Sequence, residues 1–138
     1  MTEQLVHNQQ PRLRQHPRDR FVGESHVVDL GAALRHLRAE VPVAYRRHRQ
    51  ITLLQQRTMT QVLFSFEPGS ALENHVTHGL VTIHVLEGHL TVYADGQAHE
   101  LSAGYVLVLN PDVAHDVRAV ETSAMLLTVQ LDGTRDVR

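Results

Sequence analysis

The sequence predicts an all-β domain, a barrel or a sandwich, with one short helix on its N-terminal side. Three observations predict this fold class. From about residue 50 onward, apolar residues alternate with polar ones, which is the period of half-buried strands. Turn-forming Gly, Pro, Asn and Asp residues divide this region into seven or eight short segments, as in sandwiches and barrels. A helical period occurs in one segment, before Pro42.

The helix is expected at about residues 30–40. Asp29 carries a side chain suited to cap the first turn, and Pro42 ends the helix. Its apolar face consists of residues at helical spacing, namely Leu30, Ala33, Leu34 and Leu37. The segment is therefore expected to pack one face on the β-domain.

The chain is expected to divide into a tail, a helical lead-in and a barrel. Residues 1–25 are polar, with four Arg and two Pro, and form a tail that is either disordered or laid against a partner subunit. The short helix and its lead-in occupy residues 26–49, and the barrel occupies residues 50–132. Residues 1–60 carry ten Arg against five acidic residues, a net charge of +5, whereas residues 61–138 carry three against ten, a net charge of −7.

The strands are expected as a succession of short segments. QITLLQQ and TQVLFSF form a hairpin that turns around Arg57 and Thr58, and EPGSALEN is a loop. LVTIHVLEG is a strand with one face formed by Val81, Ile83 and Val85. LTVYADG turns at Asp95–Gly96 into the next strand, QAHEL. GYVLVL is a continuous apolar run that suits a strand buried on both faces, and AHDVRAV and SAMLLTVQL close the chain.

Composition excludes several classes of function. The chain has no Cys, which excludes disulfides, thiolate metal sites and a Cys nucleophile. No apolar run reaches the roughly 18 residues of a membrane helix, and the N-terminus lacks a secretory signal, so a cytoplasmic protein that binds no membrane is expected. Few aromatic residues and no Trp argue against nucleic acid as a partner. The cluster of Arg46, Arg47 and Arg49 could grip an anion, but a solvated or subunit-facing segment is the preferred interpretation.

Two motifs, in this order, resemble those of the cupin superfamily, whose members form a small double-stranded β-helix barrel of the jelly-roll type. The first family motif is a Gly, five residues, two His separated by one residue, a Glu, and a final Gly. Gly69 and His75 have this spacing, and VLEG ends at Gly88, where the final Gly belongs. The second motif is reproduced by GYVLVLNPDVAH, from Gly104 to His115. The resemblance covers roughly residues 50–131 and implies a homodimer.

The sequence departs from the family pattern at the metal-binding positions. The second family His falls at Thr77, the family Glu falls at Val81, and Asp112 replaces a turn Gly, so only His75 and His115 match. The chain is also similar to a subgroup of small, mostly uncharacterised cupins that carry a single His here and have a short helix before the barrel.

The resemblance implies a divalent transition metal (Zn, Fe, Mn, Ni or Cu) at the mouth of the barrel. Neutral imidazoles are suitable ligands for all of these ions. His75 and His115 come from different strand ends that converge in the cupin barrel. His78 is the candidate third ligand, because Gly79 could let the backbone turn and re-aim its side chain. On a regular strand, however, residues 75 and 78 would point to opposite faces.

The other barrel histidines are weaker candidates for the site. His84 points away from the interior if Val81, Ile83 and Val85 point inward, and enters it in the opposite register. His89 and His99 are expected on outer, exposed faces.

Three functions remain open on the sequence. The first is a metal-dependent enzyme, such as a dioxygenase or isomerase, acting on a small organic molecule. The second is a barrel that binds or senses a small ligand without turnover, with or without a metal. The third is an interaction protein with a vestigial site. A fold that supports many activities does not choose among them.

Overall fold

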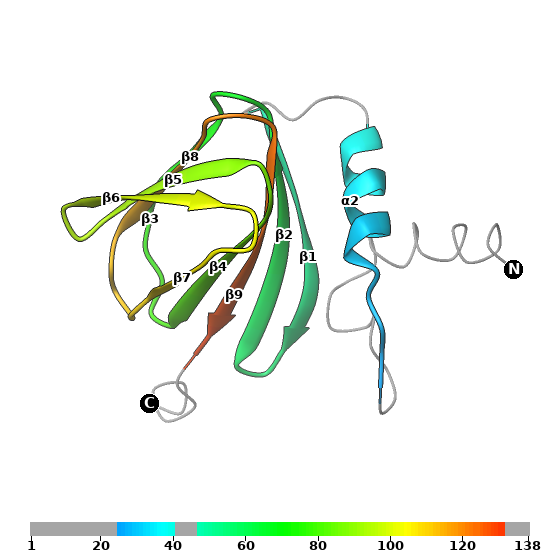
Figure 1. Ribbon diagram of the computed structural model, residues 1–138. Coiled ribbons are helices and arrows are strands. Elements are labelled where there is room, and N and C mark those ends of the chain that lie inside the picture. The colour runs from blue at the N-terminus through cyan, green and yellow to red at the C-terminus, as the bar shows by residue number, and fades with distance from the viewer. Residues whose placement is uncertain (1–24, 41–46, 132–138) are drawn as a thin grey trace, which may run out of the picture.

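Two antiparallel β-sheets face each other and enclose the apolar core, and the helix that the described residues form lies outside them (Figure 1). The computed structural model describes residues 25–40 and 47–131. The five-stranded sheet contains, in spatial order, β1 (His48–Gln56), β2 (Met59–Phe66), β9 (Ser123–Gln130), β4 (Leu80–Glu87) and β7 (Val106–Leu109). The four-stranded sheet contains β3 (Ala71–His75), β8 (His115–Ala119), β5 (His89–Ala94) and β6 (Gln97–Ser102). The prediction of an all-β barrel with one short helix is confirmed.

The predicted hairpins are present. β1 and β2 pair around Arg57 and Thr58, and β5 and β6 pair around Asp95–Gly96. The two-residue turn places Ala94 opposite Gln97, so the register of this hairpin is fixed by the turn.

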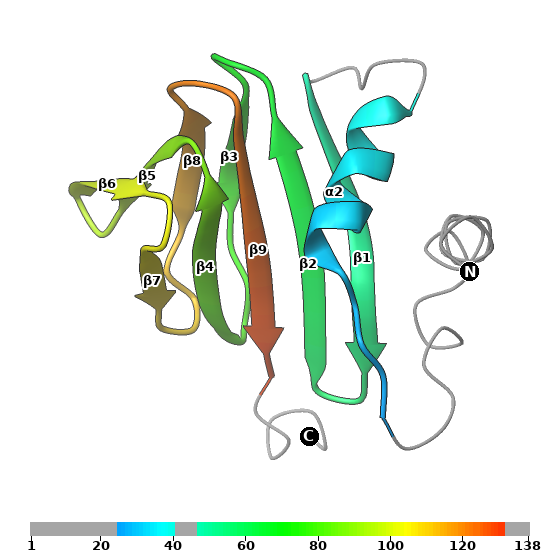
Figure 2. The ribbon, with the colours of Figure 1, turned by 45° about the vertical axis from the view of Figure 1, so that its right-hand side comes forward.

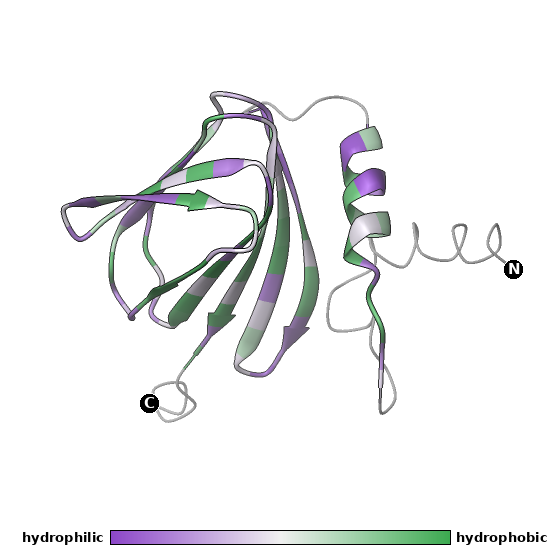
Figure 3. Ribbon diagram, viewed as in Figure 1, coloured by the Kyte–Doolittle hydropathy of each residue, from purple (hydrophilic) through white to green (hydrophobic). Residues whose placement is uncertain are grey.

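The core lies between the inner faces of the two sheets. In β4 the alternation is as predicted, because Val81, Ile83 and Val85 are buried while the residues between them are partly exposed. Figure 3 shows the same alternation of hydrophobic and hydrophilic residues along the strands. The largest buried side chains of this core include Phe64, Phe66, Ile83, Leu90 and Met125. Burial of such side chains supplies the main driving force for closing the barrel.

Two strand predictions are wrong. The segment EPGSALEN, expected to be a loop, contributes residues 71–74 to β3, because Leu72 packs inward opposite Val117. The run GYVLVL forms an edge strand, β7, rather than a strand buried on both faces. Val106 and Val108 are 54% and 56% exposed on its outer face. The run lacks polar residues, so its alternation cannot be detected from hydropathy.

The helix α2 (Leu30–Ala39) lies across the outer face of β1 and β2 (Figure 2). Asp29 caps it as predicted, since its Oδ1 accepts a hydrogen bond of 3.0 Å from the backbone N–H of Ala32. Its buried face forms a second apolar cluster with the sheet, which includes Ala33, Leu34, Leu37, Ile51, Leu53 and Leu63. Pro42, which was expected to end the helix, lies outside the described residues.

Arg38 links the C-terminal end of α2 to the five-stranded sheet through side-chain hydrogen bonds. Its Nε donates to Oγ of Ser65 at 3.0 Å, and its Nη1 contacts Oε1 of Glu87 at 2.9 Å. Ser65 is buried, whereas Glu87 is exposed at the end of β4. The guanidinium therefore connects α2 to β2 and β4 at once.

We expect Arg38→Ala to lower the free energy of unfolding by about 1–2 kcal/mol, because it leaves the buried hydroxyl of Ser65 without its partner. Arg35→Ala is the matched control, since Arg35 is exposed on the same helix and its loss is expected to change stability by less than about 0.5 kcal/mol. Urea denaturation of both variants measures the difference. Equal losses would show that the contacts of Arg38 do not hold the helix in place.

Several sequence predictions concern residues that the structure does not describe. The polar tail falls almost wholly in residues 1–24, and Arg46 lies in the gap at 41–46. Within residues 25–40 and 47–131, no helix is long and apolar enough to cross a membrane.

Candidate functional site

His75 and His115 form a cross-strand pair on the inner face of the four-stranded sheet. They are direct partners in the β3–β8 register, and their ring centroids lie 5.9 Å apart at an angle of 44°. His115 is only 5% exposed, whereas His75 is exposed at the end of β3. The neighbouring pair, Leu72 and Val117, points into the core, which fixes the face of the sheet. The two imidazoles thus lie where the core meets solvent, a place we call the barrel mouth.

The tautomer of His115 follows from its hydrogen bond. Its Nδ1 lies 3.2 Å from the carbonyl oxygen of Val113. Because a carbonyl only accepts, Nδ1 carries the proton, and in the neutral ring Nε2 keeps its lone pair. This is the state in which an imidazole binds a metal ion or accepts a proton from a ligand.

His78 contacts a different partner. It lies in the loop between β3 and β4, where the parity of a strand does not apply, and its Nδ1 is 2.7 Å from Oδ1 of Asp112. The backbone N–H of Asp112 also donates to the carbonyl oxygen of Thr77 at 2.8 Å. These two bonds join the β3–β4 loop to the β7–β8 loop beside the barrel mouth.

Asp112 has a positive φ of 68°. Such backbone is costly for most residues but tolerated by Asp and Asn. The family pattern has a Gly here, so the side chain of Asp112 adds a contact that Gly lacks.

Gly79 does not have the role expected of it. Its φ is not positive, so it does not re-aim His78 through a left-handed turn. Instead, a Cβ at this position would lie 2.7 Å from the carbonyl oxygen of Gln130. The glycine is required because β9 passes close to the start of β4.

The structure brings together two of the three proposed metal ligands. Among residues 25–40 and 47–131, no group of three or more His, Asp or Glu side chains is placed to hold one metal ion. The chemistry of His75 and His115 fits a transition metal, and any remaining coordination positions would be filled by water or by a ligand.

The other histidines of the barrel divide between the two faces. His84 pairs with Val106 and Leu126 on the outer face of the five-stranded sheet. Of the two registers expected for β4, the observed one is that in which Val81, Ile83 and Val85 point inward. His89 is also on an outer face, where its Nε2 donates to Oε1 of Glu100 at 2.7 Å. This hydrogen bond, followed by one from Thr91, lowers the pKa of the Glu100 carboxyl.

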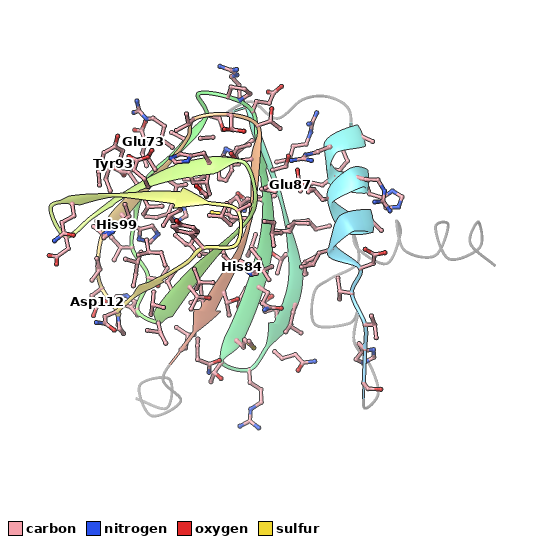
Figure 4. The ribbon with its side chains drawn as sticks, in the orientation of Figure 1. Glu73, His84, Glu87, Tyr93, His99 and Asp112 are labelled. Atoms are coloured by element: carbon pink, nitrogen blue, oxygen red, sulfur yellow. The ribbon has the colours of Figure 1, made fainter. Side chains whose placement is uncertain are left out.

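The prediction that His99 lies on an outer face is wrong. His99 is the direct partner of Val92, whose side chain is wholly buried in the core, so both point to the inner face of their sheet. The signal was present in the Asp95–Gly96 turn. A two-residue hairpin that pairs Ala94 with Gln97 necessarily pairs Val92 with His99. Figure 4 shows His99 and Asp112 on the side of the barrel remote from α2, and Glu87 on the side facing it.

An apolar wall belongs to the same end of the barrel. Val81 and Leu109 are partners in the β4–β7 register, and Val81 and Val129 are partners in the β4–β9 register. The loop before β4 joins it to His75, and the loop after β7 joins it to His115. The barrel mouth therefore combines imidazoles on the four-stranded sheet with aliphatic side chains on the five-stranded sheet.

Comparison with solved structures supports the same fold. A conserved protein of unknown function from Streptococcus pyogenes is 22% identical with a TM-score of 0.64, covering 80% of this chain and 91% of that one. An RmlC-like cupin from Desulfovibrio desulfuricans is 26% identical with a TM-score of 0.61, covering 79% and 97%. KdgF from a Halomonas species is 20% identical with a TM-score of 0.56, covering 64% and 84%.

The sequence itself matches a known family. No curated protein matches it at a significant level. The pattern of the family described as Cupin domain, however, matches residues 62–130, which is half of the chain and most of the barrel. With the sheet topology and the cupin structures in agreement, this protein belongs to the cupin family.

Proposed function

We propose that this cupin binds a small organic ligand at the barrel mouth, next to a divalent transition metal held by His75 and His115. The observation that carries the proposal is the cross-strand pair, with ring centroids 5.9 Å apart and Nδ1 of His115 bonded to a carbonyl oxygen. The backbone thus fixes a ring whose Nε2 is available as a ligand. A bound metal would supply a Lewis-acidic centre for an oxygen donor of the ligand.

Binding is favoured over turnover because the described residues place no carboxylate at the family Glu position. The family Glu position is occupied by Val81, which is 2% exposed and part of the core. Asp112 is bonded to His78, and Asp116 is the partner of Tyr93 on the outer face. A dioxygenase or isomerase is the alternative, and it requires one of the imidazoles to act as the base.

Metal titration of untagged protein tests the proposal. We expect isothermal titration with Zn²⁺ or Ni²⁺ to show one ion per chain for the wild type. His115→Ala and His75→Ala are each expected to weaken binding at least about tenfold. His78→Ala is the matched control, because that ring is bonded to Asp112, and it should keep the wild-type affinity.

Two results would contradict the proposal. Binding of metal by His115→Ala with unchanged affinity would remove the pair from the site. A loss in His78→Ala as large as that in His115→Ala would show that three imidazoles share the ion in solution, as the sequence alone suggested.

A further inference from the structure

We propose that His99 is a further ligand-binding residue of the barrel mouth and that the ligand it selects carries a carboxylate group. This inference rests on the proposed site at the mouth, and it concerns the part of the ligand that does not reach the His75–His115 pair.

His99 has the position that such a residue needs. Its partner in β5 is Val92, which is 0% exposed, so the imidazole lies on the inner face of the sheet. His99 itself is only partly buried, because β6 is the edge strand of the four-stranded sheet. Among the residues that the structure describes, none forms a hydrogen bond or an ion pair with its ring. Its nitrogens therefore remain available to a molecule that enters the mouth.

His99 and His115 lie on the same inner face but do not touch. β5 separates their strands, and the β5 partners of His99 and His115 are Val92 and Ala94. Two strand spacings and a shift of two residues give roughly 12 Å between their Cα atoms. Among the described residues, His99 does not form a three-residue metal group with His75 and His115. The separation suits a small organic molecule held at one end by His99 and at the other by His115.

The hydrogen-bonding capacity of His99 suits an anionic group. Of the imidazoles on this inner face, His99 is the one whose ring has no hydrogen-bond partner among the described residues, so it can offer an N–H donor to a ligand. The buried polar residues of the described chain are four hydroxyl residues and His115, with no carboxylate among them: Ser65, Ser70, Thr91, His115 and Ser123. Beside the mouth, the carboxylate of Asp112 is already bonded to His78. A carboxylate of the ligand would therefore accept the N–H of His99 as a charge-assisted hydrogen bond.

The apolar side chains opposite the imidazoles favour a particular kind of body for the ligand, the part other than its carboxylate. Val81 and Leu109 are buried, and Val113 and Val129 pack against the core while remaining partly exposed. These aliphatic side chains favour a hydrocarbon body over a polyol. The ligand class is therefore a small organic acid with an apolar body.

The experiment uses butanoate as the probe, with 1-butanol and butylammonium as its neutral and cationic counterparts. Each is titrated into the ¹⁵N-labelled full-length protein, once after treatment with EDTA and once after loading with Zn²⁺. We expect butanoate, but neither counterpart, to shift the backbone amide signals of His99 and Val92. His99→Ala and His99→Phe, the second of which retains a ring for packing, are expected to weaken butanoate binding about tenfold.

His84→Ala is the control, because His84 lies on the outer face of the other sheet and should leave butanoate binding unchanged. Equal shifts with 1-butanol, or full binding by both His99 variants, would overturn the inference. Comparison of the EDTA-treated with the Zn²⁺-loaded protein separates the inference about His99 from the proposal that His75 and His115 bind a metal. Butanoate binding that depends on His99 in the EDTA-treated protein supports the inference even if no metal binds to His75 and His115.

Discussion

Gly88→Ala is expected to unfold most of the protein, lowering the free energy of unfolding by more than about 3 kcal/mol. Gly88 connects β4 to β5 with a φ of 81°, a conformation that L side chains rarely adopt. A Cβ at this position would also lie 2.3 Å from both the carbonyl oxygen of Thr122 and Oγ of Ser123. The added Cβ cannot be accommodated unless the chain at Thr122 and Ser123 shifts.

The neighbouring chain cannot shift cheaply because Ser123 is fixed by hydrogen bonds. Its Oγ accepts from the backbone N–H of His89 at 3.0 Å and lies 3.1 Å and 2.7 Å from the carbonyl oxygens of His89 and Glu121. Ser123 is completely buried, so a displaced hydroxyl would find no water to replace these partners. The steric conflict and the loss of these hydrogen bonds therefore both lower the free energy of unfolding of the variant.

Gly96→Ala is the matched control for this prediction. Gly96 has a similar φ of 72°, but nothing lies within 4 Å of the position that a Cβ would take. Only the cost of left-handed backbone remains, about 1 kcal/mol. Thermal and urea unfolding of both variants would measure the difference. Equal losses at the two positions would show that backbone strain, and not the contact with Thr122 and Ser123, makes Gly88 necessary.

Local patterns in the sequence were sufficient to predict the elements that short-range chemistry determines. The capped helix begins after Asp29 because one carboxylate oxygen meets one backbone N–H three residues ahead. The β5–β6 hairpin forms at Asp95–Gly96, both of which have positive φ. The alternation of Val81, Ile83 and Val85 gave the inward face of β4. Each of these features involves residues close together along the chain.

Features that depend on distant pairing were not predictable in the same way. β7 has the same hydropathy on both faces, and only its position at the edge of the five-stranded sheet exposes Val106 and Val108. β3 is short and contains polar residues, and it forms because Leu72 finds Val117 across the sheet. Local periodicity contains no information about which strand becomes the neighbour.

In the candidate site, too, local motifs identified some residues, whereas contacts between distant segments could not be predicted. His75 and His115 could be selected because two family motifs mark their positions, and the structure makes them direct partners. The bond between His78 and Asp112 joins residues 34 positions apart in two loops, and no pattern in either loop predicts it. His99 lies in neither family motif, and its inward direction depends on extending the register of the hairpin.

Val81→Glu restores the carboxylate of the family motif and is expected to lower the free energy of unfolding by about 3 kcal/mol at pH 7. Val81 is 2% exposed in the apolar core, where an ionised carboxylate has no counter-charge unless a metal is bound. Burial raises the pKa of the introduced carboxyl above that of the unfolded chain. Because the folded state then binds the proton more tightly, the charge-dependent part of the loss is absent below the pKa of the unfolded chain, near about 4.3, and grows as the pH rises above it.

Val81→Gln separates the charge from the shape, because Gln has the size and shape of Glu but does not ionise in this range. Its loss of stability should not vary with pH, whereas that of Val81→Glu should shrink as the pH falls from 7 to 4. If His75 and His115 hold a metal, Zn²⁺ should raise the melting temperature of Val81→Glu more than that of the wild type, since the ion supplies the missing counter-charge. A Val81→Glu variant as stable as the wild type at pH 7 without metal would show that water reaches position 81, which would contradict an apolar wall at the barrel mouth.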